Sequence, residues 1–310
     1  MSLCDDRFAL SRRGLVRGLA AGGAMAALGG SVPALALGSS AGAEASWPRV
    51  TALLERYVGQ RQLAGAIAAF GWGDGPLSTI VRGREAFDDP DEVGPDSLFR
   101  VYSMTKPVTG MAAMMLIDEG KLGLDQPLAD FFPQFARMQV AIDPDKGLES
   151  RPAQTAITIR HLMTHTAGFG YAGITRNKVG EELLARGVTP AIASRLQIPG
   201  LTPPVPTPDA AEFLRRAAQV PLVAEPGTKW HYSMGLDILG LVIQQVSGAE
   251  SFAAFLQERL FGPAGMASTF FRVPKGETRR LATNYGIMGG VPLPMDPAES
   301  SIYLDPTPFA

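Results

Sequence analysis

The apolar pattern of the chain changes character near Asp125, and this change limits the folds that the sequence can adopt. Before it, two short apolar runs at residues 64–72 and 77–81 flank a Gly-Asp-Gly-Pro turn, which predicts a hairpin of two buried strands. After it, apolar residues recur at spacings of three and four up to about Met266, with Pro-rich loops between them. Strands followed by a long helical region predict an α+β architecture, with an antiparallel sheet flanked by helices.

The same spacing predicts individual helices. One covers residues 46–60, and a second runs from Ser103 or Met104 to Glu119. Three more are predicted over residues 209–219, 235–246 and 250–260. Residues 198–208 hold five prolines without periodicity, which predicts a rigid surface loop inside one domain.

The first 43 residues have the order of an export signal. Arg12 and Arg13 precede a mildly apolar run rich in Ala and Gly, and small-residue sites follow, ending at Ala36 or Ala43. The adjacent arginines resemble a twin-arginine signal, which delivers folded proteins to the bacterial export machinery. We therefore expect a signal at residues 1–43, a folded domain at residues 44–310, and a periplasmic or secreted protein. An uncleaved membrane anchor is the alternative.

Composition narrows the kinds of partner. The 28 basic and 30 acidic residues nearly balance, so no basic surface for nucleic acid is expected and a small-molecule substrate is favoured. The single cysteine, Cys4, lies in the predicted signal, ahead of its apolar run. This position excludes disulfides and a Cys nucleophile from residues 44–310, and it excludes a lipoprotein.

A serine and a lysine stand three residues apart at the predicted start of a helix. Pro107 is tolerated only in a first helical turn, so the helix begins at about Ser103 or Met104, and Gly120 closes it. Lys106 then lies on the same face as Ser103, where its side chain can reach the hydroxyl. Free N–H groups at a helix N-terminus also favour a developing oxyanion.

Lys106 can accept a proton only when it is neutral. Moving the pKa of a lysine from about 10.4 to near 7 costs on the order of 4–5 kcal/mol. The predicted helix is apolar nearly all round, so burial can supply this shift. A Ser-x-x-Lys spacing is common by itself, and a capping serine beside a surface lysine is the structural alternative.

Four ordered segments carry a resemblance to a known family. They read F-R-V-Y-S-M-T-K-P-V-T-G at residues 99–110, I-T-I-R-H-L-M-T-H-T-A-G-F at 157–169, E-P-G-T-K-W-H-Y-S at 225–233 and P-A-G-M at 263–266. Together they resemble the serine β-lactamase-like hydrolases, which include class C β-lactamases, family VIII carboxylesterases and penicillin-binding proteins. The resemblance implies a β-lactamase/transpeptidase-like fold with a large helical region.

The resemblance also implies roles for particular residues. By position, Ser103 is the acylated nucleophile, Lys106 the base or proton shuttle, and Tyr232 a second proton shuttle. Such a serine hydrolase works through an acyl-enzyme intermediate and needs neither a metal nor an organic cofactor. Without the resemblance, a core aromatic with a hydrogen-bonded hydroxyl would be the ordinary role of Tyr232.

One residue departs from the family pattern. The tyrosine motif of the family often ends in an asparagine that contacts the substrate's amide, and here that position is Met234. An apolar side chain cannot make this hydrogen bond, which favours a carboxylesterase acting on small esters. A β-lactamase, a D-alanyl-D-alanine carboxypeptidase and a catalytically silent envelope protein of the same fold are the alternatives.

Two other residue patterns in the sequence point to different chemistry, and each lacks a required residue. His161 and His165 stand four residues apart, but Leu162 occupies the place of the general-base Glu in a zinc-protease H-E-x-x-H motif, so they are expected to be structural. Ser233 lies in a sequence close to a G-x-S-x-G elbow. No histidine follows His231, as an α/β-hydrolase triad requires.

The end of the sequence raises a further expectation. Relatives continue past the tyrosine motif into strands that carry a Lys-Thr-Gly or His-x-Gly motif, whereas only residues 268–273 are predicted as a strand here. We therefore expect the C-terminal strands to be missing and the chain, by itself, to be inactive. The alternative is a variant that closes its site with Tyr285 or with the backbone of Gly289 and Gly290.

Overall fold

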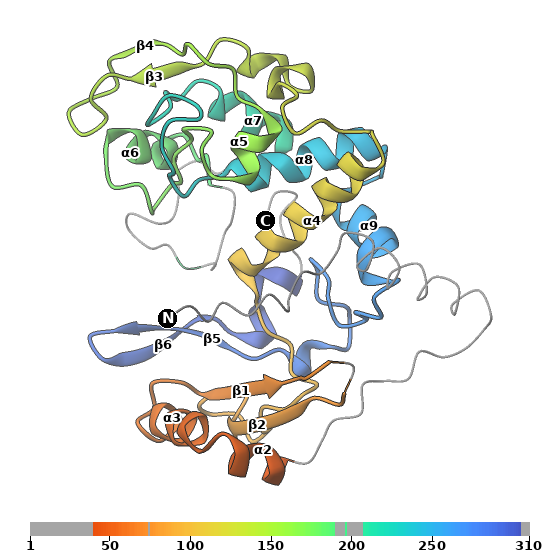
Figure 1. Cartoon of the computed structure of the whole chain (residues 1–310). Helices are drawn as coiled ribbons and strands as arrows, with labels where there is room; N and C mark the ends of the chain where they lie inside the picture. The colour runs from red at the N-terminus through yellow and green to blue at the C-terminus, as the bar shows by residue number, and fades with distance from the viewer. Residues whose placement is uncertain (1–39, 74, 190–195, 197–206, 305–310) are drawn as a thin grey trace, which may run out of the picture.

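The computed structural model describes residues 40–73, 75–189, 196 and 207–304, which form a small α/β layer and a larger helical part (Figure 1). In the small layer, helices α2 (Ser40–Ser46) and α3 (Pro48–Gly59) pack on a hairpin of strands β1 (Gly65–Phe70) and β2 (Ser78–Gly83). Residues 1–39 of the predicted signal, and most of the Pro-rich loop, lie outside the described residues.

The predicted hairpin and the helix before it are confirmed. β1 and β2 pair in antiparallel register over six residues each. The strands are less buried than expected: Thr79 and Ile80 of β2 are buried, while β1 is mostly half-buried. Ile80 packs with Ala43 of α2 and Leu54 of α3, which forms a core separate from that of the helical part.

Helix α8 (Gly235–Ser247) forms the centre of the helical part, where it packs against α4 (Thr105–Asp118) and α5 (Ile159–Met163). It is apolar on nearly every side and is buried accordingly. The remaining helices are α6 (Lys178–Ala185), α7 (Ala210–Ala217) and α9 (Phe252–Leu256), which continues as a π-helical turn, Gln257–Phe261.

Among the described residues, no single helix is both long and apolar enough to cross a membrane. Helix α8 and residues Phe252–Phe261 reach that length and character only together, and they are bent by 75° at the break between them.

Two short strands lie in the helical part, where none is predicted. β3 (Gln139–Ala141) pairs antiparallel with β4 (Ser150–Pro152). Each strand has three residues, which is too short for an alternating pattern to be recognised in a sequence.

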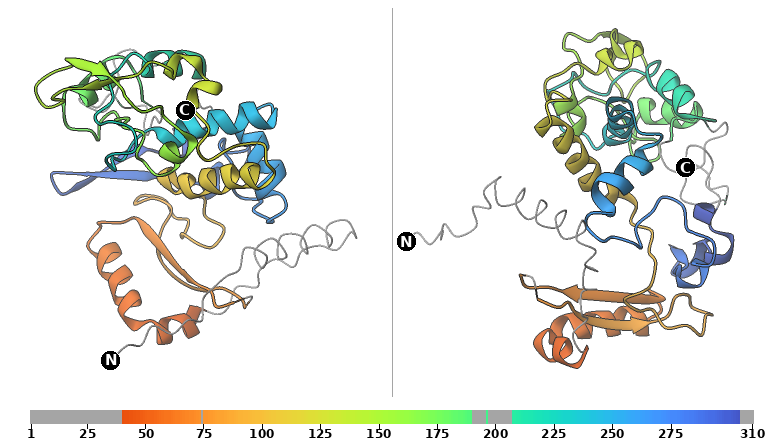
Figure 2. Two further views of the ribbon diagram at one scale, coloured as in Figure 1. Left: turned by 45° about the horizontal axis from the view of Figure 1, so that its top comes forward. Right: turned by 90° about the vertical axis from the view of Figure 1, so that its right-hand side faces the viewer.

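The prediction of a strand at residues 268–273 is wrong, because these residues form turns and irregular backbone. The strands lie later, where β5 (Asn284–Met288) pairs antiparallel with β6 (Val291–Asp296). Gly289 and Gly290, with φ of 60° and 83°, supply the two positive φ values of a tight hairpin turn. Both figures place this hairpin between the small layer and the helical part (Figures 1 and 2).

Candidate active site

Ser103 lies in a single 3-10 turn, Tyr102–Met104, immediately before α4. The helix therefore begins at Thr105, one or two residues later than predicted, and Pro107 lies in its first turn as expected. Gly120, with φ of 70°, follows its end. Ser103 is solvent-exposed, so its hydroxyl is open to a substrate.

The structure brings together the three predicted catalytic residues. The hydroxyls of Ser103 and Tyr232 are 2.6 Å apart, and Lys106 Nζ donates to Ser103 Oγ at 3.3 Å. Lys106 Nζ also lies over two aromatic rings, 5.1 Å from the centroid of Tyr232 and 5.6 Å from that of Tyr171. Ser103 Oγ thus has hydrogen-bonding groups of Tyr232 and Lys106 within reach, as a nucleophile that must lose a proton requires.

Helix α4 is apolar nearly all round, as the sequence shows, but it is buried on one side only. Its buried residues include Thr109, Ala112 and Leu116, whereas Met111 and Met114 are exposed. Lys106 is half-buried, with its ammonium between the tyrosine rings. Aromatic faces attract a cation, so the two rings help to hold the Lys106 side chain beside Tyr232.

The residue before the nucleophile has an unusual backbone. Tyr102 has φ of 41°, which is rare for a bulky side chain. Conformations of this kind cost on the order of 1–3 kcal/mol and persist only where surrounding contacts impose them. The turn that presents Ser103 is therefore held under strain.

A loop after α5 supports the tyrosine motif. His165 Nδ1 accepts a hydrogen bond from the Ser233 N–H at 3.2 Å and lies 3.1 Å from Ser233 Oγ. Its ring is 4.8 Å from that of Tyr232 and 6.0 Å from that of Trp230. Burial lowers the pKa of His165, and the charges of Lys106 and His231 lower it further. This histidine is thus neutral near pH 7 and fixes the backbone beside Tyr232.

The two alternative constellations have structural roles. His161 Nδ1 accepts from the Thr158 N–H at 3.3 Å in a capping box that begins α5, so the two histidines of the zinc hypothesis bind different partners. Ser233 does lie beside a histidine, but it is only 1% exposed. A substrate cannot reach it, which agrees with the prediction that it is not the nucleophile.

Two residues near the site were not predicted. Tyr171 lies 5.5 Å from Tyr232 between ring centroids, and burial raises its pKa. Asp237, in the first turn of α8, has a buried Oδ2 atom with no hydrogen-bond partner among the described residues. Burial raises the pKa of Asp237 to about 6, against the opposing effect of Lys106. A carboxyl group between Leu236 and Ile238 in an apolar helix was the available sequence signal.

Three further residues were expected to affect substrate choice or to close the site, and each makes its contacts away from Ser103. Met234 is 1% exposed and belongs to the main core. Tyr285 Oη accepts from the Phe87 N–H at 3.1 Å, and its ring packs edge-on against Phe87. Gly289 forms part of the β5–β6 turn. Tyr285 is thus committed to the contact with Phe87 rather than to Ser103.

Comparison with known proteins gives a consistent family signal. Residues 50–303 match the family model described as Beta-lactamase. The chain is 37% identical over 191 residues to an uncharacterized protein of Mycobacterium tuberculosis, covering 61% of this chain and 43% of that protein. It is 30% identical over 242 residues to esterase EstB of Burkholderia gladioli, covering 76% of this chain and 54% of that esterase.

Solved structures show the same fold. EstCE1, described as a hydrolase with promiscuous acyltransferase activity, has a TM-score of 0.61 and 25% identity, covering 80% of this chain and 58% of its own. Simvastatin synthase LovD of Aspergillus terreus has a TM-score of 0.59 and 22% identity, covering 81% and 61%. The chain thus spans about half the length of the curated relatives it matches.

Proposed function

Because the chain belongs to the beta-lactamase family, we propose that it is a serine hydrolase that works through an acyl-enzyme on Ser103. The observation that carries this proposal is the geometry of Ser103 Oγ, which lies 2.6 Å from Tyr232 Oη and 3.3 Å from Lys106 Nζ. These are hydrogen-bond distances to two groups that can exchange protons.

The proposed reaction has two steps. Ser103 Oγ attacks the substrate's carbonyl carbon while its proton passes to the Tyr232–Lys106 pair. The tetrahedral intermediate then breaks its bond to the leaving alkoxide, which takes that proton and departs as the alcohol. Water next attacks the acyl-enzyme and gives a proton to the same pair, the bond to Ser103 Oγ breaks, Oγ takes the proton back, and the acid is released. The N-terminal end of α4 supplies favourable electrostatics for the oxyanion.

We propose small carboxylic esters as the substrate class. Met234 replaces the asparagine that would bind a substrate amide, and its side chain is buried in the core, so this position supplies no polar contact. Without that hydrogen-bonding group, the site loses a contact that would favour amide substrates, whereas ester substrates do not need this contact. The names of EstB and EstCE1 agree with this direction.

We also propose export as a folded protein, guided by residues 1–43. The support is the order of Arg12-Arg13, the Ala- and Gly-rich run and the small-residue sites. Replacement of both arginines by lysine should leave the full-length protein in the cytoplasmic fraction. Unchanged export of this variant, measured by cell fractionation, would contradict the proposal.

The nucleophile is tested by covalent labelling. The full-length protein is treated with a fluorophosphonate, and the adduct is located by mass spectrometry of peptides. Ser103→Ala should abolish the adduct, whereas Ser233→Ala, the matched control, should keep it. An adduct on the Ser103→Ala protein would show that the nucleophile is elsewhere.

A further inference from the structure

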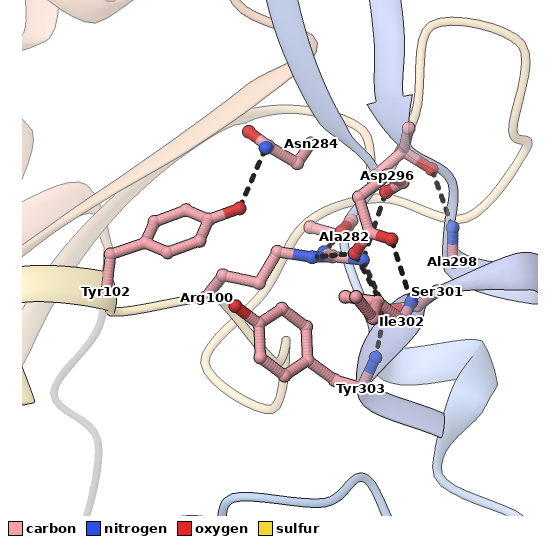
Figure 3. A network of polar contacts seen from close by, with 10 residues as sticks. Arg100, Tyr102, Ala282, Asn284, Asp296, Ala298, Ser301, Ile302 and Tyr303 are labelled. Atoms are coloured by element: carbon pink, nitrogen blue, oxygen red, sulfur yellow. Dashed lines mark hydrogen bonds and ion pairs between the residues drawn. The ribbon is translucent and has the colours of Figure 1, made fainter. Parts of the chain in front are cut away.

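The chain leading to the nucleophile runs beside the approach to β5. Leu98 N–H donates to the carbonyl of Arg280 at 2.6 Å, and Ala282 N–H donates back to the carbonyl of Leu98 at 3.0 Å. The next two alternate residues, Arg100 and Tyr102, reach the same segment through their side chains (Figure 3). Three alternate residues before Ser103 are therefore held along one line by residues 280–284.

Arg100 anchors this contact through a buried ion pair. Its Nε donates to Asp296 Oδ2 at 2.5 Å, and the side chains are 6% and 1% exposed. Its Nη2 donates to the Asp296 carbonyl at 3.0 Å and to Ser301 Oγ at 3.1 Å. Asp296 also accepts from the Ser301 hydroxyl at 2.7 Å and from the Ile302 N–H at 2.9 Å. A charge pair with this many hydrogen bonds has one well-defined position.

Tyr102 makes the contact closest to the nucleophile. Asn284 Nδ2 donates to the Tyr102 hydroxyl at 2.9 Å, and the Tyr102 ring packs edge-on against Tyr303 at 6.5 Å (Figure 3). Tyr102 is also the residue with φ of 41°, directly before Ser103. Because such a backbone persists only where contacts impose it, the contacts of its side chain determine where Ser103 Oγ lies.

We infer that Asn284, together with the Arg100–Asp296 pair, positions the nucleophile by holding Tyr102 in its strained conformation. This inference rests on the proposed role of Ser103. Asn284 touches no reacting atom and acts through Tyr102, so it is a positioning residue. Reactivity at Ser103 thus depends on a hairpin some 180 residues away in sequence.

Two substitutions remove the same hydrogen bond from opposite sides. In the full-length protein, Asn284→Ala and Tyr102→Phe should each lower kcat for ester hydrolysis and the rate of fluorophosphonate labelling by about ten- to a hundredfold, the effect of misplacing a reacting atom by about an ångström. KM should stay within about twofold, since ground-state binding is not altered. The double variant should be no slower than either single variant, because both remove one interaction.

A conservative variant separates positioning from general damage. Asn284→Asp keeps a hydrogen bond, since the Tyr102 hydroxyl can donate to the carboxylate. Removal from water raises the pKa of Tyr102 to about 12, so this hydroxyl stays protonated near pH 7. We expect Asn284→Asp to restore most of the rate that Asn284→Ala loses.

Tyr285→Phe is the matched control. It also removes a tyrosine hydroxyl from β5, but this hydroxyl bonds the Phe87 N–H and not the segment before the nucleophile. Hydrogen–deuterium exchange of the peptide covering residues 98–104 gives a readout that does not need activity. Exchange there should quicken in Asn284→Ala and stay unchanged in Tyr285→Phe. Absence of labelling in the wild type would count against the proposed function alone. Unchanged exchange and labelling in Asn284→Ala would overturn the inference.

Discussion

The Tyr232 hydroxyl lies 2.6 Å from Ser103 Oγ while its ring faces Lys106 Nζ at 5.1 Å, so one side chain contacts both the nucleophile and the cation. We predict that this contact geometry lets Tyr232 and Lys106 together relay the proton of Ser103.

Replacing Tyr232 by phenylalanine tests this role. We expect Tyr232→Phe, and likewise Lys106→Met, to reduce kcat on p-nitrophenyl esters by about two to four orders of magnitude, the usual effect of losing general acid–base catalysis. The melting temperature should change little, because Tyr232 is only half-buried and keeps its ring. Wild-type rates of Tyr232→Phe on every ester tested would disprove its role, and Tyr285→Phe serves as the control.

Asp237 should make stability depend on pH. Burial raises its pKa from the ordinary 3.8 to about 6, so the native state holds this proton more tightly than the unfolded state. The stability that the protonated form contributes is complete below pH 3.8 and is lost as the pH rises through about 6. Between pH 4 and pH 8, the free energy of unfolding of Asp237→Asn should therefore rise by on the order of 2–3 kcal/mol relative to that of the wild type.

Urea unfolding of both proteins at the two pH values measures this difference. The sign is opposite to that of the three histidines, whose lowered pKa values make the wild type less stable as the pH falls below about 6.5. Both proteins share that contribution, so it cancels in the comparison. A stability difference that is the same at both pH values would contradict the assignment.

At the scale of elements, the loop that follows α5 returns to the core through a glycine. Gly168 has φ of 81°, and its carbonyl accepts from the Val223 N–H at 2.7 Å. A Cβ atom there would lie 2.1 Å from the carbonyl oxygen of Ala224. Only glycine fits this close approach of the two backbones.

Two glycine substitutions distinguish backbone strain from collision. Gly248, after α8, has φ of 70° but open space around it, so Gly248→Ala should cost only the left-handed backbone term of about 1–2 kcal/mol. Gly168→Ala adds a collision with main chain and should cost roughly 3–5 kcal/mol. Denaturant titrations of the two variants give the comparison, and equal losses would refute it.

The elements that could be predicted are those with strong local signals. Pro107 located the start of α4, and Asp209 caps α7 by accepting from the Glu212 N–H at 2.8 Å. The helix predicted at residues 250–260 begins at Phe252 and turns π-helical at Gln257, a change that periodicity does not reveal. Strand β6 escaped prediction because Pro292 and Pro294 interrupt its alternation, although the adjacent glycines before it are a strong turn signal.

The residues of the site likewise divide into those that local sequence signals predict and those that they do not. Ser103 and Lys106 are three residues apart, so helical geometry alone predicts their contact. Tyr232 is 129 residues from Ser103, and only the family resemblance placed it there. Asp237 was missed because its proximity to Lys106 depends on how α8 packs against α4. Tyr171 was missed because it reaches Lys106 from the loop between α5 and α6, and such an approach is a tertiary property.

At the scale of the whole molecule, the substrate preference is the property to test. We expect p-nitrophenyl acetate or butyrate to be turned over at least about a hundredfold more efficiently than nitrocefin, because the site lacks a hydrogen-bond donor at Met234. The measurement is kcat/KM for both substrates on the full-length protein. A ratio near one would favour a β-lactamase over an esterase.

The contacts between residues 98–102 and the hairpin also bear on how the protein is made. Arg100 is separated from Asp296 by 196 residues and from Ser301 by 201, so these bonds close among the longest loops in the chain. A growing polypeptide at the ribosome forms local helices early, whereas contacts of such long range wait until both partners have emerged. A nascent chain that has already formed α4 therefore still lacks the hydrogen bonds that hold the segment before Ser103, and these form only after residues 282–301 have been synthesised.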